Sequence, residues 1–394
     1  MRLSALREGK ALIYVPDTRP ALRGDGTLEP AWLEVFYNPA MTLNRDLSMV
    51  AAMAFLGGRG KASVLDALAG TGVRGLRYLL EVARDGIAII NDIDARAYEL
   101  IKSNVELNGL GGRAVPANRD ASSLMYSLSH EMGLAFDVVD IDPFGSPAPY
   151  VDAAIAATSR GGLLGITATD LAVLGGSKIA AARRVYGAVL PGPMREYREV
   201  AIRVLLAYVA GRAAEHDRAL RPLLAVSLGH YVRVHATFER GARAANETLS
   251  RSVGCFRLRR DVGAVELSDE LPDGRDCFGP VWTGPLGSPE LVEGASGMLS
   301  AGELSYLESR QRLAEVLGKL RDEARLSWFF HYRLDSVCSR MRANIPKMGK
   351  VRAVIEGSGH AFAESHLDPL SFRTDAPPDL VAEACVKAST SRAP

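Results

Sequence analysis

Short apolar runs alternate with amphipathic stretches between about residue 61 and residue 167. The runs have the length of buried strands, and the stretches between them carry apolar residues at helical spacing. Strands that alternate with helices in this way predict a parallel, doubly wound sheet of the α/β class. The predicted strands are Ala62–Leu65, Ile87–Ile90, Arg113–Val115, Phe136–Ile141 and Gly162–Thr167, and the predicted helices are Val73–Ala83 and Ala95–Asn108.

Other patterns flank this core. The first 40 residues are extended and rich in turns, and a helix is predicted from Asn44 to Leu56, ended by Gly57 and Gly58. A long amphipathic helix is predicted from about Met194 to Glu215. Two strands, Leu223–Ser227 and Tyr231–Phe238, follow on either side of Gly229. This spacing predicts an antiparallel hairpin at the edge of the sheet.

The character of the chain changes near Gly241. The segment from there to about residue 300 is rich in glycine and proline and has few apolar runs. Helical periodicity returns over Glu303–Glu323 and again over Leu334–Met341. We therefore predict two domains, residues 1–259 with the α/β sheet and residues 260–394 as a smaller α+β domain.

The net charge, the cysteines and the absence of long apolar runs restrict the kinds of partner and cellular location that we expect. The 394 residues carry 47 basic and 46 acidic side chains, for a net charge of +1, so a polyanionic partner must be bound by local basic patches. The four cysteines are far apart in sequence and contain no C-x-x-C pair, which indicates reduced thiols of a cytoplasmic protein. We expect no signal peptide, membrane-spanning segment or obligate protein partner, because the first residues lack an apolar core and no uncharged apolar run approaches membrane-spanning length.

A glycine-rich loop follows the first strand of the predicted sheet. It runs from Asp66 to Gly75 and includes Gly70 and Gly72, and it opens a helix whose first N–H groups can bind a ligand. The same pattern suits a dinucleotide, so an NAD-dependent dehydrogenase is an alternative. The glycines by themselves do not decide between that cofactor and S-adenosylmethionine.

Acidic residues end four successive strands. Asp66 can face an ammonium or sulfonium charge, and Asp92 can accept hydrogen bonds from ribose hydroxyls. Asp120, followed by the small Ala121, can bind adenine, although it is equally a candidate helix N-cap. With Asp142, these carboxylates should meet beyond the carboxyl ends of the strands, where ligands bind in such sheets. This convergence favours S-adenosylmethionine.

The most specific stretch is Asp142–Pro147, which directly follows the fourth strand. The Asp142 carboxylate and the Pro143 carbonyl can accept hydrogen bonds from an exocyclic amine, and the Phe144 ring can stack on the base that carries it. An ordinary turn with proline and glycine is the alternative. With the cofactor residues upstream, the stretch favours methyl transfer to a nitrogen of a nucleobase.

Taken together, these motifs resemble the archaeal and eukaryotic tRNA guanine-N2 dimethyltransferases. The resemblance rests on Phe36–Asp46 (F-Y-N-P…N-R-D), the Asp66–Gly75 loop, Asp142–Pro147 and Thr167–Asp170, and it continues through Gly279–Trp282 and Gly284–Leu286. It implies a class I, Rossmann-like methyltransferase that transfers two methyl groups from S-adenosylmethionine to N2 of guanine 26 of tRNA, leaving S-adenosylhomocysteine. Residues 1–259 would be the catalytic domain and residues 260–394 the tRNA-binding domain.

The resemblance also assigns roles to residues. Asp142 would be the catalytic carboxylate, assisted by Pro143, with Phe144 and Phe36 on either side of the guanine. Arg45 would pair with the methionine carboxylate, which its planar guanidinium suits. Without the resemblance, Phe36 and Arg45 would be interpreted as a packed ring and a surface ion pair. The predicted cofactor-binding residues are Arg45, Asp66, Gly70, Gly72, Arg74, Asp92, Ile93, Asp120 and Ala121.

Basic side chains near the carboxyl terminus predict where RNA binds. Arg340, Arg342, Lys347, Lys350 and Arg352 form a run without acidic residues, and phosphate binding is the functional interpretation. Arg257, Arg259 and Arg260 form a second basic run and Arg183 and Arg184 a third, and a solvated surface is the alternative for each.

Zinc is not expected. Some relatives carry paired cysteines in the second domain, but this chain has only Cys255 and Cys277 in that region, too few ligands for a structural site. His360 and His366 are interpreted as ordinary surface residues.

Rival functions remain open at this point. Another amino methyltransferase would act on guanine N2 of rRNA, adenine N6, cytosine N4 or a protein glutamine. Those families more often have a second proline where this chain has Phe144. A tRNA-binding module with a vestigial cofactor site is the third alternative, although the intact set of carboxylates argues against it.

Overall fold

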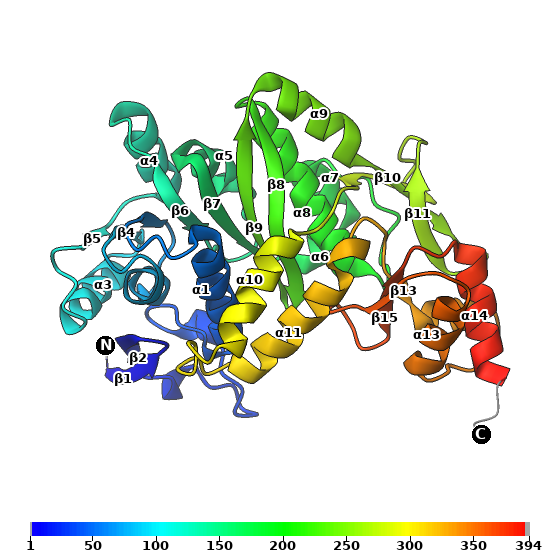
Figure 1. Ribbon diagram of the computed structural model, residues 1–394. Helices are drawn as coiled ribbons and strands as arrows, with labels where there is room; N and C mark the ends of the chain where they lie inside the picture. Colours follow the sequence, from blue (N-terminus) through cyan, green and yellow to red (C-terminus); the bar gives the residue numbers. More distant parts are fainter. Residues whose placement is uncertain (1, 391–394) are drawn as a thin grey trace. The chain divides into compact units, whose positions relative to one another are not determined.

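A seven-stranded sheet forms the centre of the fold in the computed structural model, which describes residues 2–390 (Figure 1). The strand order is β5-β4-β3-β6-β7-β9-β8, and the pairs β3–β4, β3–β6, β4–β5 and β6–β7 are parallel. The order reverses beside β3, which creates the switch point where ligands bind in doubly wound sheets. The strands are β3 (Ser63–Asp66), β4 (Ile87–Asn91), β5 (Ala114–Ala117), β6 (Phe136–Ile141), β7 (Thr158–Ala168), β8 (Arg218–Leu228) and β9 (Tyr231–Arg240).

The helices of the α/β core confirm the periodicity seen in the sequence. Helix α1 ends at a left-handed Gly57 with φ 56°, as the paired glycines predict. The second predicted helix is an α-helical segment continued by a π-helical turn, and the two strands around Gly229 are separated by two residues, as an antiparallel hairpin requires. The helices are α1 (Thr42–Leu56), α2 (Val73–Arg77) with η4 (Tyr78–Val82), α3 (Ala95–Leu107), α4 (Ala121–Tyr126) with η5 (Ser127–Glu131), α5 (Ala148–Ala157), α6 (Leu171–Leu174), α7 (Ile179–Tyr186) and α8 (Tyr197–Ala214).

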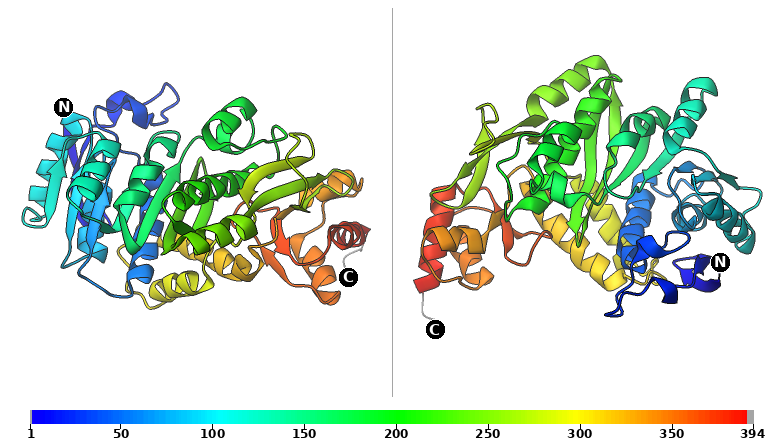
Figure 2. Two further views of the ribbon diagram at one scale, coloured as in Figure 1. Left: turned by 90° about the horizontal axis from the view of Figure 1, so that it is seen from above. Right: turned by 180° about the vertical axis from the view of Figure 1, so that it is seen from behind.

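The amino-terminal segment is more ordered than its turn-rich sequence indicates. Strands β1 (Leu3–Glu8) and β2 (Ala11–Pro16) form an antiparallel hairpin, followed by the 3₁₀ turns η1 (Arg19–Ala21), η2 (Pro30–Trp32) and η3 (Pro39–Met41). Asn104 and Asn108 of α3 exchange side-chain hydrogen bonds with the backbone of Tyr14 and Leu12. The hairpin therefore lies against α3, as Figure 2 shows.

Chain packing divides the protein into two compact units. The first comprises Met1–Ala168, His235–Phe238 and Glu293–Glu315, and the second comprises Thr169–Val234, Glu239–Val292 and Val316–Pro394. These units do not divide at residue 259, because Glu293–Glu315 packs with the first unit. Gly294 of α10 (Pro289–Ser300) faces Ala54 of α1, and an added Cβ on Gly294 would lie 3.7 Å from the alanine Cβ. Figure 1 shows α10 in yellow beside α1 in blue.

The predicted helix over Glu303–Glu323 begins later than the sequence pattern indicates. Helix α11 spans Arg310–Glu323, and turns precede it. The backbone N–H of Ser309 donates to Asp46 Oδ2 at 3.1 Å, and the Ser309 hydroxyl donates to the same oxygen. This tertiary contact ties the residue before the helix to a buried carboxylate, which the helical periodicity of the sequence could not reveal.

The glycine- and proline-rich segment contains regular structure that its sequence does not predict. Helix α9 (Ala242–Ser252) leads into a three-stranded sheet of order β11-β10-β12. A second small sheet of order β13-β15-β14 and helices α12–α14 form the carboxyl-terminal part, drawn in orange and red in Figure 2. The elements are β10 (Val253–Arg259), β11 (Ala264–Ser268), β12 (Cys277–Trp282), η6 (Ala324–Leu326), β13 (Tyr332–Arg333), α12 (Leu334–Arg340), α13 (Met348–Gly357), β14 (Phe362–Glu364), β15 (Ser371–Thr374) and α14 (Pro378–Thr390).

A buried ionic network stabilises the second unit. Arg373 donates through Nη1 to Glu199 Oε1 at 2.9 Å and through Nε to Glu323 Oε2 at 2.8 Å. The ring nitrogen Nδ1 of His366 also contacts Glu323, so the prediction that His366 is an ordinary surface residue is wrong: its side chain is buried. Burial opposes ionisation of Glu323, but His366 and Arg373 outweigh it and lower its pKa to about 2.

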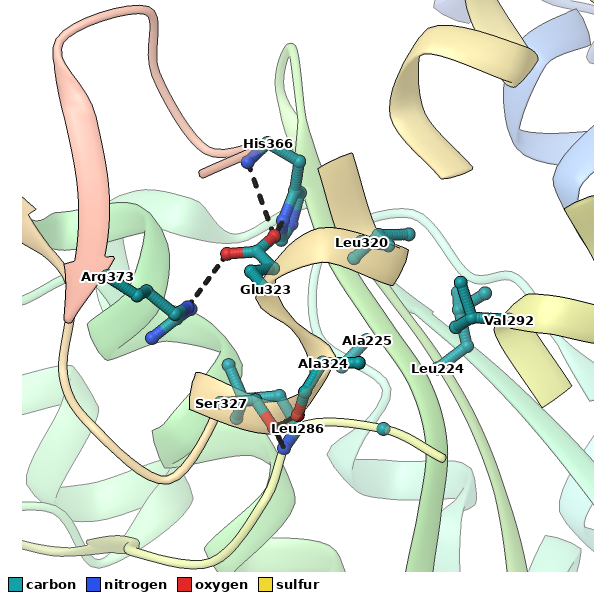
Figure 3. A pocket seen from close by; sticks show the side chains of 11 residues that line it. Leu224, Ala225, Leu286, Val292, Leu320, Glu323, Ala324, Ser327, His366 and Arg373 are labelled. Carbon is teal, nitrogen blue, oxygen red and sulfur yellow. Dashed lines mark hydrogen bonds and ion pairs between the residues drawn. The ribbon is translucent and has the colours of Figure 1, made fainter. Parts of the chain in front are cut away.

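This network borders a small cavity of about 20 Å³, shown in Figure 3. Arg373 Nη2 and His366 Nε2 are buried and have no hydrogen-bond partner within the described chain.

Candidate active site

The glycine loop has a conformation that its glycines make possible. Gly70 and Gly72 have φ values of 54° and 81°, in the left-handed region. A Cβ on Gly70 would lie 2.9 Å from the Phe36 carbonyl oxygen, and a Cβ on Gly75 would lie 2.8 Å from Ile90 Cγ1. The Phe36 backbone and the Ile90 side chain therefore pack closely against the loop, and larger residues cannot replace these glycines without displacing their neighbours.

Asp66 lies at the end of β3, as predicted, and closes this loop. Its Oδ2 accepts a hydrogen bond from the backbone N–H of Gly75 at 2.8 Å, and its side chain is buried. Burial, together with the nearby charge of Asp140, raises the pKa of Asp66 to about 7. A cation placed beside Asp66 would favour its charged form.

Asp92 lies just beyond β4 and faces the loop. Its two carboxylate oxygens accept backbone hydrogen bonds from Gly70 at 2.8 Å and from Asp94 at 2.9 Å. Burial raises its pKa. Asp92, Gly70, Phe36 and Phe144 line a cleft of about 380 Å³. Four residues that the sequence assigned to one site therefore border the same cleft.

Asp142 follows β6, and its carboxylate is held by Arg74. Arg74 Nη2 donates to Asp142 Oδ2 at 2.6 Å, and Arg74 Nε lies 3.6 Å from Asp140 Oδ1. Burial disfavours the charged guanidinium, but Asp140 and Asp142 outweigh it and raise the pKa of Arg74. The Asp142 side chain is 23% exposed, whereas that of Arg74 is 4% exposed. The carboxylate is thus accessible to a ligand and is supported from the protein interior.

Two phenylalanine rings meet beside this carboxylate. The centroids of Phe36 and Phe144 are 4.3 Å apart, and the rings are nearly perpendicular at 86°. Phe144 is 67% exposed, which is unusual for so large an apolar side chain. A planar base inserted between two rings requires about 7 Å between them, twice a stacking distance. The rings must therefore separate to take a base between them.

The remaining predicted cofactor residues occupy different settings. Asp120 accepts from the backbone N–H of Ser123 at 2.8 Å, so it is the N-cap of α4, one of the two roles that the sequence left open. Ala121 is buried, and Ile93 is 66% exposed. Their contact with a cofactor stays a prediction.

Arg45 takes part in a buried ion pair. Its Nε and Nη2 donate to the two carboxylate oxygens of Glu8, each at 2.6 Å, and Nη2 also donates to the Asn38 carbonyl oxygen. Arg45 and Arg77 outweigh the burial of Glu8 and lower its pKa to about 2. Arg45 therefore forms an ion pair, as the alternative interpretation expected, but the pair is buried and does not lie at the surface. A contact of Arg45 with a methionine carboxylate stays a prediction.

Two polar side chains that the sequence did not single out adjoin Arg74. Asn44 Oδ1 accepts from Arg74 Nη2 at 2.8 Å, and Ser48 Oγ accepts from Arg74 Nη1 at 2.9 Å. Asn44 lies in the N-R-D motif, so its position in that motif was a usable signal. Asn44 Nδ2 and Thr71 Oγ1 are buried and have no hydrogen-bond partner within the described residues. Such groups beside a glycine loop fit a polar cofactor that completes their hydrogen bonds.

The predicted RNA-binding residues lie in the second unit and differ in their surroundings. Arg340 is exposed at the end of α12, and Lys347 is the N-cap residue of α13. Arg352 contacts Glu364 at 3.3 Å and lies over the Phe362 ring. Arg259 and Arg260 of the second basic run pair with Asp261 and Asp276, which does not favour them as phosphate ligands. Arg342 has a φ of 52°, and Lys350 lies in α13.

Within residues 2–390, no three His, Cys, Asp or Glu side chains are grouped so that they could bind a metal ion. The absence of zinc stays a prediction. In the same residues, every helix is too short or too polar to cross a bilayer.

A doubly wound sheet with a glycine loop after β3, an acidic residue after β4 and an aromatic-flanked carboxylate after β6 defines a class I, S-adenosylmethionine-dependent methyltransferase. The protein-family model described as N2,N2-dimethylguanosine tRNA methyltransferase matches residues 9–386, and the chain belongs to this family.

Individual relatives agree with this assignment. The chain is 41% identical to the tRNA (guanine(26)-N(2))-dimethyltransferase of Aeropyrum pernix, over 99% of this chain and 98% of that relative. It is 35% identical to the enzyme of the same name from Metallosphaera sedula, over 99% and 98% of the two chains. The solved structure of Trm1 from Pyrococcus horikoshii with S-adenosyl-L-methionine superimposes with a TM-score of 0.84 at 32% identity, covering 97% of this chain and 99% of that one.

Proposed function

We propose that this protein transfers two methyl groups from S-adenosylmethionine to N2 of guanine 26 in tRNA, with Asp142 as the catalytic carboxylate. The observation that carries the proposal is the setting of Asp142. It is held at 2.6 Å by the buried Arg74, and its neighbour Phe144 borders the same cleft as Gly70 and Asp92. The names of the relatives support the substrate.

S-adenosylmethionine, when bound, supplies the methyl group. We propose that the cofactor is held by Asp66 and Asp92 at the ends of the strands, by the loop with Gly70 and Gly72, and by Ile93, Asp120 and Ala121. Asp66 would face the positive charge of the cofactor, which would favour ionisation of a carboxyl whose pKa is about 7 without it. Arg45 and Arg74 belong to the same proposed set.

The chain's own residues then act on the guanine. Phe36 and Phe144 hold the base after it has left its stack in the RNA. The Asp142 carboxylate and the Pro143 carbonyl accept hydrogen bonds from the N2 amine and orient its weakly nucleophilic lone pair. They also stabilise the positive charge that develops on N2, and Asp142 takes the released proton directly or through water. After the first transfer N2 keeps one hydrogen, so the same groups can act a second time.

The buried guanidinium of Arg74 pairs with the Asp142 carboxylate and holds in place the group that we propose accepts the proton. Arg74 donates to Asp142 Oδ2, and we propose that Asp142 Oδ1 is the oxygen that accepts from the N2 amine.

The regions outside the cleft complete the proposal. Residues 1–259 would carry catalysis and residues 260–394 would bind tRNA, with phosphate contacts from Arg340, Arg342, Lys347, Lys350 and Arg352. The proposed location is the cytoplasm, where tRNA is used.

The first experiment incubates the purified protein with labelled S-adenosylmethionine and an unmodified tRNA transcript, and identifies the nucleosides by mass spectrometry. Dimethylguanosine at position 26, absent from a transcript with adenine 26, is the expected product. Methylation at another position would contradict the proposed target, and no transfer would contradict the activity.

A second experiment tests the catalytic carboxylate. Asp142→Asn should lower the rate of transfer at least about 100-fold, because the amide can neither take the proton nor balance the charge on N2. Its affinity for S-adenosylhomocysteine, measured by calorimetry, should change little. Asp25→Asn, at an exposed position, is the control. Full activity of Asp142→Asn would show that another group is the base.

A further inference from the structure

The hydrogen bond with Arg74 determines which way the side-chain amide of Asn44 is oriented. Arg74 can only donate hydrogen bonds, so the Asn44 atom at 2.8 Å from Arg74 Nη2 must be the oxygen Oδ1. The amide nitrogen Nδ2 therefore points away from the guanidinium. The whole residue is buried at 0% exposure, and Nδ2 has no hydrogen-bond partner within the described chain. A buried donor without a partner is costly, which implies that a ligand completes it.

The same amide supports the catalytic carboxylate through Arg74. Helix α1 presents Asn44 and Ser48 one turn apart, and they accept from Nη2 and Nη1 of Arg74. The Ser48 hydroxyl in turn donates to the backbone carbonyl oxygen of Asn44 at 2.7 Å. The second hydrogen of Nη2 is donated to Asp142 Oδ2 at 2.6 Å. Both N–H groups of Nη2 are thus used by protein atoms, which makes Arg74 a support for Asp142.

We propose that Asn44 binds the methionine carboxylate of S-adenosylmethionine through Nδ2, and that it orients Arg74 through Oδ1 so that Arg74 positions Asp142. This inference rests on the proposed function. The amide N–H needs an acceptor oxygen, and a carboxylate is the strongest acceptor that the two substrates offer. A guanine carbonyl oxygen has the same chemistry, and the experiment separates the two sources. One amide thus links the binding of the cofactor to the orientation of the catalytic carboxylate.

The test compares two ligands by calorimetry, S-adenosylhomocysteine and 5′-methylthioadenosine, which lacks the amino-acid part. Asn44→Asp keeps the shape of the side chain but replaces the donor with a negative charge. This substitution should lower the affinity for S-adenosylhomocysteine about 10- to 100-fold. The affinity for 5′-methylthioadenosine should stay within about twofold of the wild-type value. Asn44→Ala should show the same preference with a smaller loss.

Ser48→Ala is the matched control on the same helix, because it removes one support of Arg74 and leaves Nδ2 in place. It should keep the affinity for S-adenosylhomocysteine and lower kcat, with KM for tRNA little changed. Unchanged affinity of Asn44→Asp for S-adenosylhomocysteine would overturn the proposal. An equal loss of affinity for both ligands would also overturn it. An effect confined to KM for tRNA would overturn it too, because it would assign Nδ2 to the guanine.

The two proposals can fail separately. Ligand binding is measured without RNA, so a wild-type protein that binds S-adenosylhomocysteine but makes no dimethylguanosine would contradict only the proposed function.

Discussion

Replacement of Arg74 by methionine removes the cation that faces three carboxylates. Asp140 is buried at 0% exposure, and Asp66 and Asp142 belong to the same cluster. Methionine has a similar length but no charge and no hydrogen-bond donor. The variant therefore leaves buried negative charges without their counter-ion, while most of the packing volume remains.

The expected cost follows from the burial of the pair. Breaking a buried ion pair by removing one partner costs about 3–5 kcal/mol, and the partly exposed Asp142 should contribute the smaller share because water screens it. Without Arg74, which lowers the pKa of Asp66, that pKa should rise further above both its present value of about 7 and its unfolded value of about 4. The folded variant then retains protons that the unfolded chain releases, so its stability falls as the pH rises through this range. The loss relative to wild type should be larger at pH 8 than at pH 5.

Urea unfolding of both proteins at pH 5 and pH 8 measures this difference. Arg243→Met is the matched control, since Arg243 is 93% exposed and its pair with Glu247 should be worth less than about 1 kcal/mol at either pH. If Arg74→Met does not fold, Arg74→Lys keeps the charge and should lose less stability, with a weaker dependence on pH. A loss for Arg74→Met that is below about 1 kcal/mol, or that is equal at the two pH values, would refute the reasoning.

Two further outcomes follow from the structure. Phe144→Leu should lower kcat/KM for tRNA about 5- to 150-fold, the worth of one stacked base, without changing the affinity for S-adenosylhomocysteine; a parallel loss of that affinity would mean that the ring supports the cofactor site. Glu323→Gln should destabilise the protein by about 3 kcal/mol in urea unfolding, because Arg373 and His366 lose their shared carboxylate. Glu364→Gln, in a surface ion pair, should cost less than about 1 kcal/mol, and equal effects of the two substitutions would contradict the role of burial.

The α/β core was predictable because its strands are short, mostly apolar runs. The run Phe136–Ile141, apolar except for Asp137 and Asp140, can be found without knowledge of its partners, and the structure confirms that strand to the residue. The segment from α9 to α10 was not predictable in this way. Two of its three strands, β10 and β12, contain glycine or proline, and the pairing of the strands with one another depends on tertiary contacts that the local sequence does not encode.

The sequence alone determined which residues end the strands. Asp66, Asp92 and Asp142 follow apolar runs, and the topology of a doubly wound sheet brings the ends of its strands to one edge. Of the residues that the motifs assigned to the site, Phe36, Gly70, Asp92 and Phe144 line one cleft, whereas Asp66 and Asp142 are not among its lining residues.

Only the tertiary structure decided what each side chain contacts. Arg45 binds Glu8, which is 37 positions away, and Arg74 binds Asp142, which is 68 positions away. Ser48 was not singled out, because a serine in a helix carries no signal until Arg74 is placed beside it, and the N-R-D motif marked Asn44 without revealing its contact with Arg74. Hydrogen bonds and ion pairs act over a few ångströms in space, and the sequence specifies such distances only after the chain has folded.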